Sequence, residues 1–323
     1  MDVLSGVLDV ALLASTIRLV SPILLAALGS ILSDRVGIFN VGLEGLMLVG
    51  AFFAVAGASW SGDPWVGLVL AVVAAVVLSL VYAVVVVDLG GDAIVAGLAL
   101  NLFALGATSY LIRPVFGVQG SFYDPTMRGL PDLHIPLLDG VPVLGPLVSG
   151  YSPLVYIAFV LAVVFQVWLF RHPWGIRVRA VGEAPAAAAS VGIPVRATRY
   201  AALLGTGLLC GLAGAQLSIS LVTQFVIGMT AGRGFIALVA VMFGRSHPLG
   251  VLAASVLFGF MYALTLRLQG TAVPPQFVAM LPYVVTIIVL VLYAVRQRRR
   301  TSAARSAVEE VGVETGDAPP APA

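Results

Sequence analysis

The chain has 323 residues, of which 60% are hydrophobic and 10% are charged, whereas a soluble domain is roughly 45–50% apolar and about 25% charged. This composition excludes a soluble enzyme. Nine of the 17 basic and 15 acidic residues follow Val295, which leaves 23 charged residues before that point. We therefore expect residues 1–295 to form a transmembrane domain and residues 296–323 to form a disordered cytoplasmic tail.

All 17 basic residues are Arg, so the chain has no Lys. A Walker A phosphate site and Schiff-base chemistry both require Lys. Any ATP hydrolysis that drives this protein must therefore occur in another polypeptide, and we expect no bound cofactor. The single cysteine, Cys210, lies in an apolar run and permits neither an internal disulfide nor a thiolate metal site. The first ten residues contain two Asp and no basic residue, so a cleavable signal peptide is not expected.

A membrane-spanning helix needs about 20 predominantly apolar residues. In chain order, the runs that qualify are Ala11–Ile31, Val41–Ala58, Val66–Val87, Ala93–Ile112, Leu154–Phe170, Tyr200–Val222, Leu249–Leu266 and Phe277–Val295. A shorter run, Gly232–Gly244, lies between the sixth and the seventh, and only Phe235–Phe243 within it is continuously apolar. These runs predict an all-α, polytopic membrane protein.

The distribution of Arg predicts the orientation, because Arg concentrates in short cytoplasmic loops. Five Arg lie in residues 171–199 and five more in residues 296–305, so we expect both segments in the cytoplasm. An even number of crossings must then separate them, which requires Gly232–Gly244 to cross as a short or broken helix. The prediction is about nine spans with the N-terminus outside. It places 12 Arg in the cytoplasm and four outside, the latter being Arg113, Arg128, Arg233 and Arg267.

Residues 113–151 form the longest polar segment, and this topology places them outside. Six Pro and six Gly interrupt any regular helix there. We expect an ordered cap or short re-entrant turns, since loops of this length often carry function. A passive linker is the alternative.

The cytoplasmic loop of residues 171–199 contains a predicted two-turn helix. Pro185 suits its first turn, Glu183 lies where the helix dipole favours an anion, and Gly192 ends it. Its small side chains, with Ala188 at the centre, would let a partner protein approach closely. The alternative is an ordinary surface helix with basic flanks. The candidate contact residues are Glu183, Ala184, Pro185, Ala186, Ala187, Ala188, Ala189, Ser190, Val191 and Gly192.

A second group of polar residues lies at the start of the second predicted span. If that helix begins near Asn40, then Asn40 and Glu44 lie one turn apart on one face, and Gly42 and Gly45 allow close helix approach. A carboxylate inside a span is costly, so Glu44 needs a partner. A structural clamp held by Arg or backbone amides is favoured over direct substrate contact. The candidate pathway or structural polar residues are Asn40, Glu44, Asn101 and Gln216.

No catalytic group or metal site is expected. The three histidines, His134, His172 and His247, fall in separate predicted loops, so a shared metal site is implausible. A Ser/His intramembrane protease is disfavoured because no His lies within a span.

Four blocks of sequence, spread over roughly residues 15 to 255, are distinctive when they are taken together and in this order. Ser33–Gly45 reads Ser-Asp-Arg-Val-Gly-Ile-Phe-Asn-Val-Gly-Leu-Glu-Gly. The others are Ile135–Leu138 with Val141–Pro146, Gly182–Gly192, and Gly232–Leu238 with Phe243–Gly250. Together they resemble the permease subunits of bacterial ATP-binding-cassette (ABC) importers, in the superfamily of ribose and branched-chain amino-acid permeases. The nucleoside and simple-sugar branch, with its Ser-Glu-Arg-Ser-Gly-Val-Val-Asn-Ile-Gly-Leu-Glu-Gly signature, is most similar.

This resemblance implies a multi-pass, type II importer-like permease in the bacterial cytoplasmic (inner) membrane. It implies four partners besides the lipid bilayer: two ABC ATPase subunits that bind ATP, a second permease subunit (identical or a paralogue), and an extracytoplasmic substrate-binding lipoprotein. No nucleic-acid partner is expected. Residues 183–192 would be the helix that docks on the ATPase. Asp34 replaces the usual Glu, and the Ala-rich docking segment lacks the usual Arg or Asn after Pro185.

The function expected from the resemblance is inward transport of nucleosides or related simple sugars by alternating access. The alternatives are a branched-chain amino-acid ABC permease and, less favoured, an ion-coupled secondary transporter. A secondary transporter would carry carboxylates at mid-membrane depth, where only Glu44 is a candidate. A purely structural membrane scaffold is a further alternative.

Overall fold

The computed structural model describes residues 9–134, 144–269, 280 and 284. The chain divides into two units, Met1–Arg267 and Leu268–Ala323, and nearly all described residues belong to the first. Three predicted features lie wholly or almost wholly outside the described residues: the last span, Phe277–Val295, the tail of residues 296–323, and the block around residues 135–143.

Seven helices in the described part of the chain are long and apolar enough to cross a membrane. They agree with the first seven predicted runs to within five residues at either end. Two of them continue as π-helical segments, η1 (Val84–Asp88) after α4 and η2 (Gln216–Val222) after α10. The seven are α2 (Val10–Arg35), α3 (Leu43–Ser61), α4 (Pro64–Ala83), α5 (Ala93–Phe116), α7 (Pro153–Arg171), α10 (Val195–Ala215) and α12 (Pro248–Leu268). The prediction of an all-α polytopic protein is confirmed; the count of nine spans stays a prediction.

Shorter elements connect the long helices. The helices are α6 (Leu144–Val148), α8 (Pro173–Glu183), α9 (Pro185–Ser190) and α11 (Arg233–Gly244). Strands β1 (Ser121–Tyr123) and β2 (Gln224–Val226) pair antiparallel, with Phe122 opposite Phe225. This ribbon joins the segment after α5 to the segment before α11.

Local sequence explains where the helices begin and how α2 tolerates proline. The Asp63 carboxylate accepts a hydrogen bond from the Trp65 amide at the start of α4, and Asp92 caps α5 in the same way. Pro22, inside α2, cannot donate to the carbonyl of Arg18, four residues earlier. The Ser21 hydroxyl donates to that carbonyl instead, at 2.8 Å. The side chain thus replaces the missing backbone bond.

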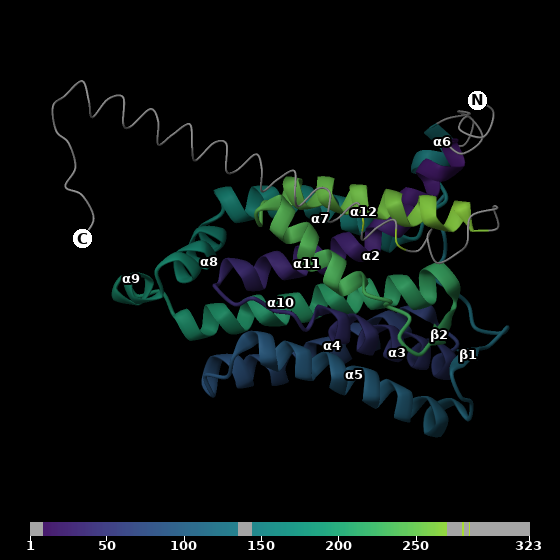
Figure 1. The fold of residues 1–323 in the computed structure, drawn as a ribbon, viewed down its shortest axis with the longest axis horizontal. Helices are drawn as coiled ribbons and strands as arrows, with labels where there is room; N and C mark the ends of the chain where they lie inside the picture. Colours follow the sequence, from purple (N-terminus) through teal and green to yellow (C-terminus); the bar gives the residue numbers. More distant parts are fainter. Residues whose placement is uncertain (1–8, 135–143, 270–279, 281–283, 285–323) are drawn as a thin grey trace. The chain divides into compact units, whose positions relative to one another are not determined.

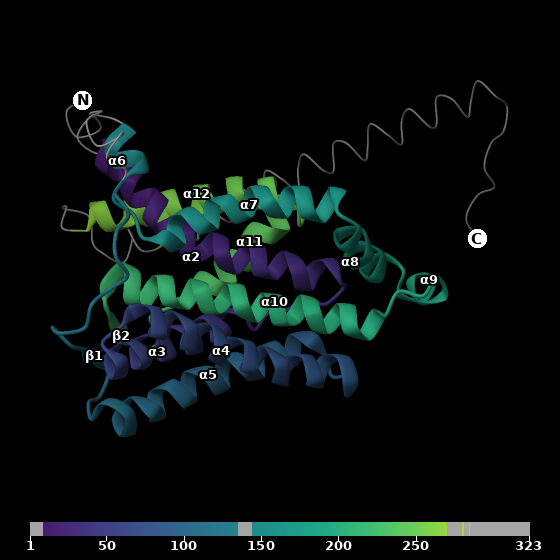
Figure 2. The same ribbon diagram turned by 180° about the vertical axis from the view of Figure 1, so that it is seen from behind.

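Helix α10 lies at the centre of the bundle, between α2 on one side and α3 and α4 on the other (Figures 1 and 2). Its glycines make this close packing possible: a Cβ atom at Gly211 would lie 2.9 Å from the carbonyl oxygen of Ala71. Two hydrogen bonds between helices add to the packing. Thr206 donates to the carbonyl of Gly29 at 2.8 Å, and Ser79 donates to that of Leu203 at 2.6 Å.

The described unit has two distinct ends. At one end the Arg35 guanidinium donates to the carbonyl of Ser246 at 2.7 Å, beside α8 and α9. At the other end lie the β1–β2 ribbon and Arg18, which donates to the carbonyl of Gly150 at 3.1 Å. The predicted cytoplasmic and external segments thus separate to opposite ends, as the predicted topology requires.

Candidate functional site

Glu44 lies in the first turn of α3 and is held by the backbone of α11. Its Oε1 accepts a hydrogen bond from the amide of Gly232 at 2.8 Å, and its Oε2 accepts one from the amide of Gly234 at 2.7 Å. Of the predicted partners, the backbone amides are therefore the ones that hold Glu44. Arg18 and Arg35 instead bind the carbonyls of Gly150 and Ser246.

Two helix N-termini converge on this carboxylate. Glu44 belongs to the first turn of α3, and it binds the first free amides of α11. Each N-terminus carries a partial positive charge and amides without an intrahelical partner. The carboxylate accepts from two amides of α11 and lies in the first turn of α3, which explains how an acidic residue is tolerated among apolar helices. Gly234 makes the contact possible, because a Cβ there would lie 2.5 Å from the Glu44 amide nitrogen.

Asn101, on α5, holds the same end of α3 from the other side. Its Oδ1 accepts from the amide of Gly45 at 2.7 Å, and its Nδ2 donates to the carbonyl of Val41 at 3.0 Å. The helices approach closely here, since a Cβ at Gly45 would lie 3.0 Å from the Cα of Asn101. The structure therefore brings Asn101 and Glu44 to one place, the N-terminus of α3.

Asn40 does not lie on α3, contrary to the expectation that it shares a helix face with Glu44. The helix begins at Leu43, because Asn40 forms a turn in which its Oδ1 accepts from the amide of Gly42 at 2.8 Å. Asn40 is only 1% exposed, and its Nδ2 has no partner among the described residues.

Gln216 is separate from this group. It opens η2, and its Oε1 accepts a hydrogen bond from the Ser152 hydroxyl at 2.9 Å, while its buried Nε2 has no partner among the described residues. Sequence reasoning did not anticipate the π-helical geometry that positions it. Such segments often occur at functional sites.

Helix α11 is too short to cross a membrane by itself. Its 12 residues span about 18 Å at 1.5 Å per residue, against a hydrocarbon core of about 30 Å. Between β2 and α11 the chain runs in turns. Arg233, predicted to lie outside, begins α11, where it donates to the carbonyl of Met229 at 3.0 Å and lies over the Tyr262 ring. Its side chain is half-buried.

The predicted two-turn helix is present as α9, whose first residue is Pro185. Gly192 follows with a φ of +81°, a conformation that suits glycine, and its amide donates to the carbonyl of Ala189. Two details differ from the prediction. Glu183 directly precedes the N-cap of α9, but it is also the last residue of α8, so it lies between the favourable end of one helix dipole and the unfavourable end of another. Ala188 is 3% exposed and packs into the chain's own core, so it does not face a partner.

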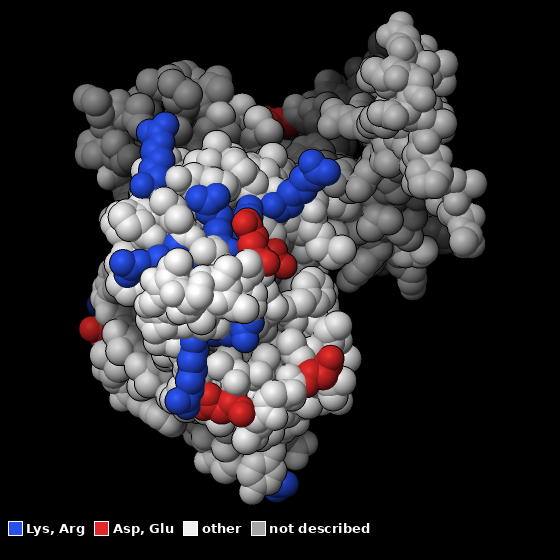
Figure 3. Space-filling view, turned by 90° about the vertical axis from the view of Figure 1, so that its left-hand side faces the viewer, with Lys and Arg blue, Asp and Glu red and all other residues white. Residues whose placement is uncertain are grey.

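The other residues of α9 are exposed, as is Val191 immediately after it. They form a small, uncharged surface. Figure 3 shows Arg side chains around this end of the molecule, where α8 and α9 lie. The exposed surface of α9 is therefore small and uncharged, and both Arg and acidic side chains lie around it.

Helix α8, which sequence reasoning missed, joins α9 to the rest of the bundle. The signal was present: Pro173 is a suitable first residue, and the His172 ring accepts from the Trp174 amide at 3.3 Å. At its other end, Gly182 packs directly on α2. A Cβ at Gly182 would lie 2.2 Å from the carbonyl oxygen of Arg35 and 3.1 Å from the Gly37 nitrogen.

Asp34 links the end of α2 to the end of α11. The Ser246 hydroxyl donates a hydrogen bond to the Asp34 carboxylate, and Arg35 binds the Ser246 carbonyl. A continuous set of contacts therefore leads from α9 through α8 to the ends of α2 and α11.

The described part of the predicted external segment is ordered by backbone pairing. Leu133 forms a bridge to Tyr151, and β1 pairs with β2. Asp124 closes a turn, because its carboxylate accepts from both the hydroxyl and the amide of Thr126. These bonds hold the pKa of the Asp124 carboxyl below its ordinary value. Helix α5 continues to Phe116, so this segment begins later than predicted.

The family model described as "Branched-chain amino acid transport system / permease component" matches residues 12–290. The chain belongs to this family. The protein is thus an ABC transporter permease, a multi-pass membrane protein rather than an enzyme, and ATPase activity in such transporters belongs to a separate subunit.

Several curated relatives cover most of the permease. It is 35% identical to the guanosine ABC transporter permease NupQ of Bacillus subtilis, over 85% of this chain and 89% of NupQ. It is 37% identical to the nucleoside ABC transporter permease NupC of Lactococcus lactis, over 84% of this chain and 89% of NupC. A provisionally named glucose ABC transporter permease of Haloferax volcanii, TsgC13, is 32% identical over 92% of this chain and 94% of its own. No solved structure matches the chain.

Proposed function

We propose that this permease carries nucleosides, or related simple sugars, into a bacterial cell across the cytoplasmic membrane. The observation that carries the proposal is the similarity to NupQ and NupC, which extends over more than four fifths of the chain. The similarity to TsgC13 supports the inclusion of sugars. These relatives favour this substrate class over branched-chain amino acids, although the family description names the latter.

The similarity to ABC transporter permeases also indicates the partner proteins. ATP is bound by separate ATPase subunits, and an extracytoplasmic lipoprotein delivers the substrate. The permease partner is a second permease, and NupP of Bacillus subtilis, 26% identical to this chain, supports a paralogue in that role. Helix α5 has a broad face of exposed apolar side chains, including Leu102 and Phe103, that a second permease or lipid can cover.

The end of the bundle that carries α8 and α9 faces the cytoplasm in this proposal, and α9 docks on the ATPase. What supports the docking role is the exposed surface of small side chains that α9 presents, in a short helix that needs packing to be stable. Residues 171–199 then form the coupling loop, and residues 113–151 the external loop.

Packing and hydrogen-bond contacts transmit the movement of α9 to the neighbouring helices. Gly182 of α8 packs on Arg35, and Arg35 binds Ser246 at the end of α11. At the other end of α11, the Gly234 amide donates a hydrogen bond to Glu44, at the start of α3. We assign to Glu44, with Asn101, the role of holding the starts of α3 and α11 in place while the bundle changes conformation, rather than contact with the substrate. Asn40 and Gln216 are further polar residues in the interior of the same helix bundle.

Uptake by membrane vesicles tests the substrate class. Vesicles that contain the complete transporter are given labelled guanosine together with excess unlabelled uridine, ribose, glucose or leucine. We expect nucleosides or sugars to compete and leucine to leave uptake unchanged. Competition by leucine alone would overturn the proposed substrate class.

A further inference from the structure

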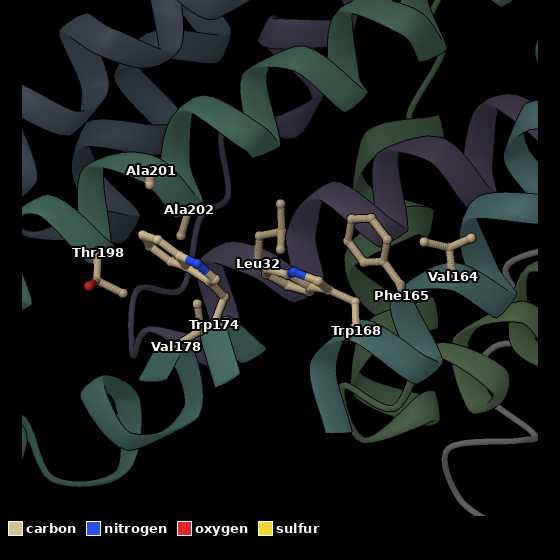
Figure 4. A pocket seen from close by; sticks show the side chains of 9 residues that line it. All are labelled: Leu32, Val164, Phe165, Trp168, Trp174, Val178, Thr198, Ala201 and Ala202. Carbon is tan, nitrogen blue, oxygen red and sulfur yellow. The ribbon is translucent and has the colours of Figure 1, made fainter. Parts of the chain in front are cut away.

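An apolar groove of about 330 Å³ lies between α2, α7, α8 and α10 (Figure 4). Two indole rings, those of Trp168 and Trp174, lie along it, and the only other polar group in its lining is the hydroxyl of Thr198. That hydroxyl already donates to the carbonyl of Pro194. Apart from the two indole N–H groups, the groove therefore offers no free hydrogen-bonding group, and its lining is suited to a hydrocarbon chain.

In the proposed orientation, on which this inference rests, the groove lies where the membrane meets water. It reaches from Val164, two turns before the end of α7, to Trp174 at the start of α8. Trp is enriched at this depth because its ring is apolar and its N–H is polar. Trp174 is 54% exposed. A chain in the groove would thus have one end in the hydrocarbon core and the other at the level of lipid headgroups.

One Arg side chain contacts a groove residue at the headgroup end, and a second Arg is next in sequence to a lining residue. The Arg177 guanidinium lies over the Trp174 ring, 5.5 Å from its centroid, and Arg199 follows Thr198 on α10. The Arg199 Nε is shielded from solvent and has no partner among the described residues. In the described part of the chain, no carboxylate forms an ion pair with Arg177 or Arg199. This end of the groove therefore has an excess of positive charge.

We propose that this groove binds an anionic phospholipid, with one acyl chain between Trp168 and Trp174 and the phosphate at Arg177 and Arg199. The apolar lining and the uncompensated Arg pair complement the two parts of such a molecule. Anionic lipids populate the cytoplasmic leaflet, where basic residues attract them. A free phosphate would use the Arg pair alone, and a protein segment would have to match both the lining and the charge.

Quenching of Trp fluorescence by brominated lipids tests this assignment, because bromine quenches only on close contact. The chain has four Trp, so Trp60→Phe with Trp65→Phe leaves only the two in the groove. The full-length protein is placed in phosphatidylcholine nanodiscs that contain increasing fractions of brominated phosphatidylglycerol or brominated phosphatidylcholine. We expect the anionic lipid to reach half-maximal quenching at a mole fraction on the order of tenfold lower.

Four variants sharpen the test. Arg177→Gln and Arg199→Gln should each reduce the preference for the anionic lipid by about fivefold. Ala201→Leu should reduce quenching by the anionic lipid because it fills the groove. Arg128→Gln, at the opposite end of the helices, should change nothing. Equal quenching by the two lipids would overturn the proposal, as would absent quenching, which means that protein covers the groove. Relief of quenching by millimolar inorganic phosphate would assign the Arg pair to a free phosphate instead.

Discussion

The carboxylate of Glu44 and the amide of Gly234 lie 2.7 Å apart, although 190 residues separate them in the chain. This bond joins the N-terminus of α3 to that of α11, the short helix that crosses only part of the bundle. The two helices are therefore fixed to each other at the level where both begin. A carboxylate that belongs to the first turn of one helix and accepts hydrogen bonds from the first amides of another gives a rigid joint inside an apolar bundle.

Replacement of Glu44 should destabilise the permease. Glu44→Gln keeps one acceptor oxygen but turns an NH2 group toward the second amide, so one amide loses its partner and the charge is lost. We expect a destabilisation of about 2–3 kcal/mol, measured as thermal unfolding of the purified protein in detergent. Glu309→Ala, in the tail, is the control and should have no effect. If the two variants unfold at the same temperature, Glu44 does not hold the helices together.

The contact between α8 and α2 should be essential for transport but not for insertion. Gly182→Ala places a methyl group 2.2 Å from the carbonyl oxygen of Arg35, so α8 must shift. We expect near-normal amounts of protein in the membrane and a several-fold loss of uptake. Gly106→Ala, in α5, is the matched control, because a Cβ there meets nothing within 4 Å. Normal uptake by the Gly182 variant would mean that this contact does not transmit movement.

Membrane topology can be tested by labelling cysteine variants in intact cells with a reagent that cannot cross the membrane. Cys210→Ala provides the background, since Cys210 is the only cysteine. Ser121 and Ser190 are both exposed and lie on opposite ends of the described unit. We predict labelling of Ser121→Cys and protection of Ser190→Cys. The reverse pattern would invert the proposed orientation.

The long helices could be predicted from the sequence because lipid imposes one strong requirement, a run of apolar residues of sufficient length. The short helix α9 was equally visible, since Pro185 and Gly192 mark its ends. Composition alone could not show that the Ala188 side chain faces the core of the chain. In a segment of small residues, no hydrophobic periodicity distinguishes the buried side chain from the exposed ones.

The hydrogen-bond partners of the polar residues could not be predicted from the sequence, for a different reason. Glu44 is held by backbone amides of Gly232 and Gly234, and amides carry no side-chain signature. The apolar run begins at Val41, which favours a helix that starts near Asn40. Its own side chain forms the turn that delays the helix to Leu43. Local competition of Asn with the backbone, a known property of this residue, decided the boundary.

Ala187→Glu tests whether α9 couples this permease to a separate ATPase. Ala187 is exposed on α9, so the substitution leaves the chain's own core intact, and Glu is a good helix former. The measurement is ATP-dependent uptake of labelled guanosine by proteoliposomes containing the wild-type or variant transporter, with the ATPase that co-purifies with each quantified. We expect the variant to insert normally but to lose both the ATPase and uptake. Full retention of the ATPase with unimpaired uptake would show that α9 does not couple the two proteins.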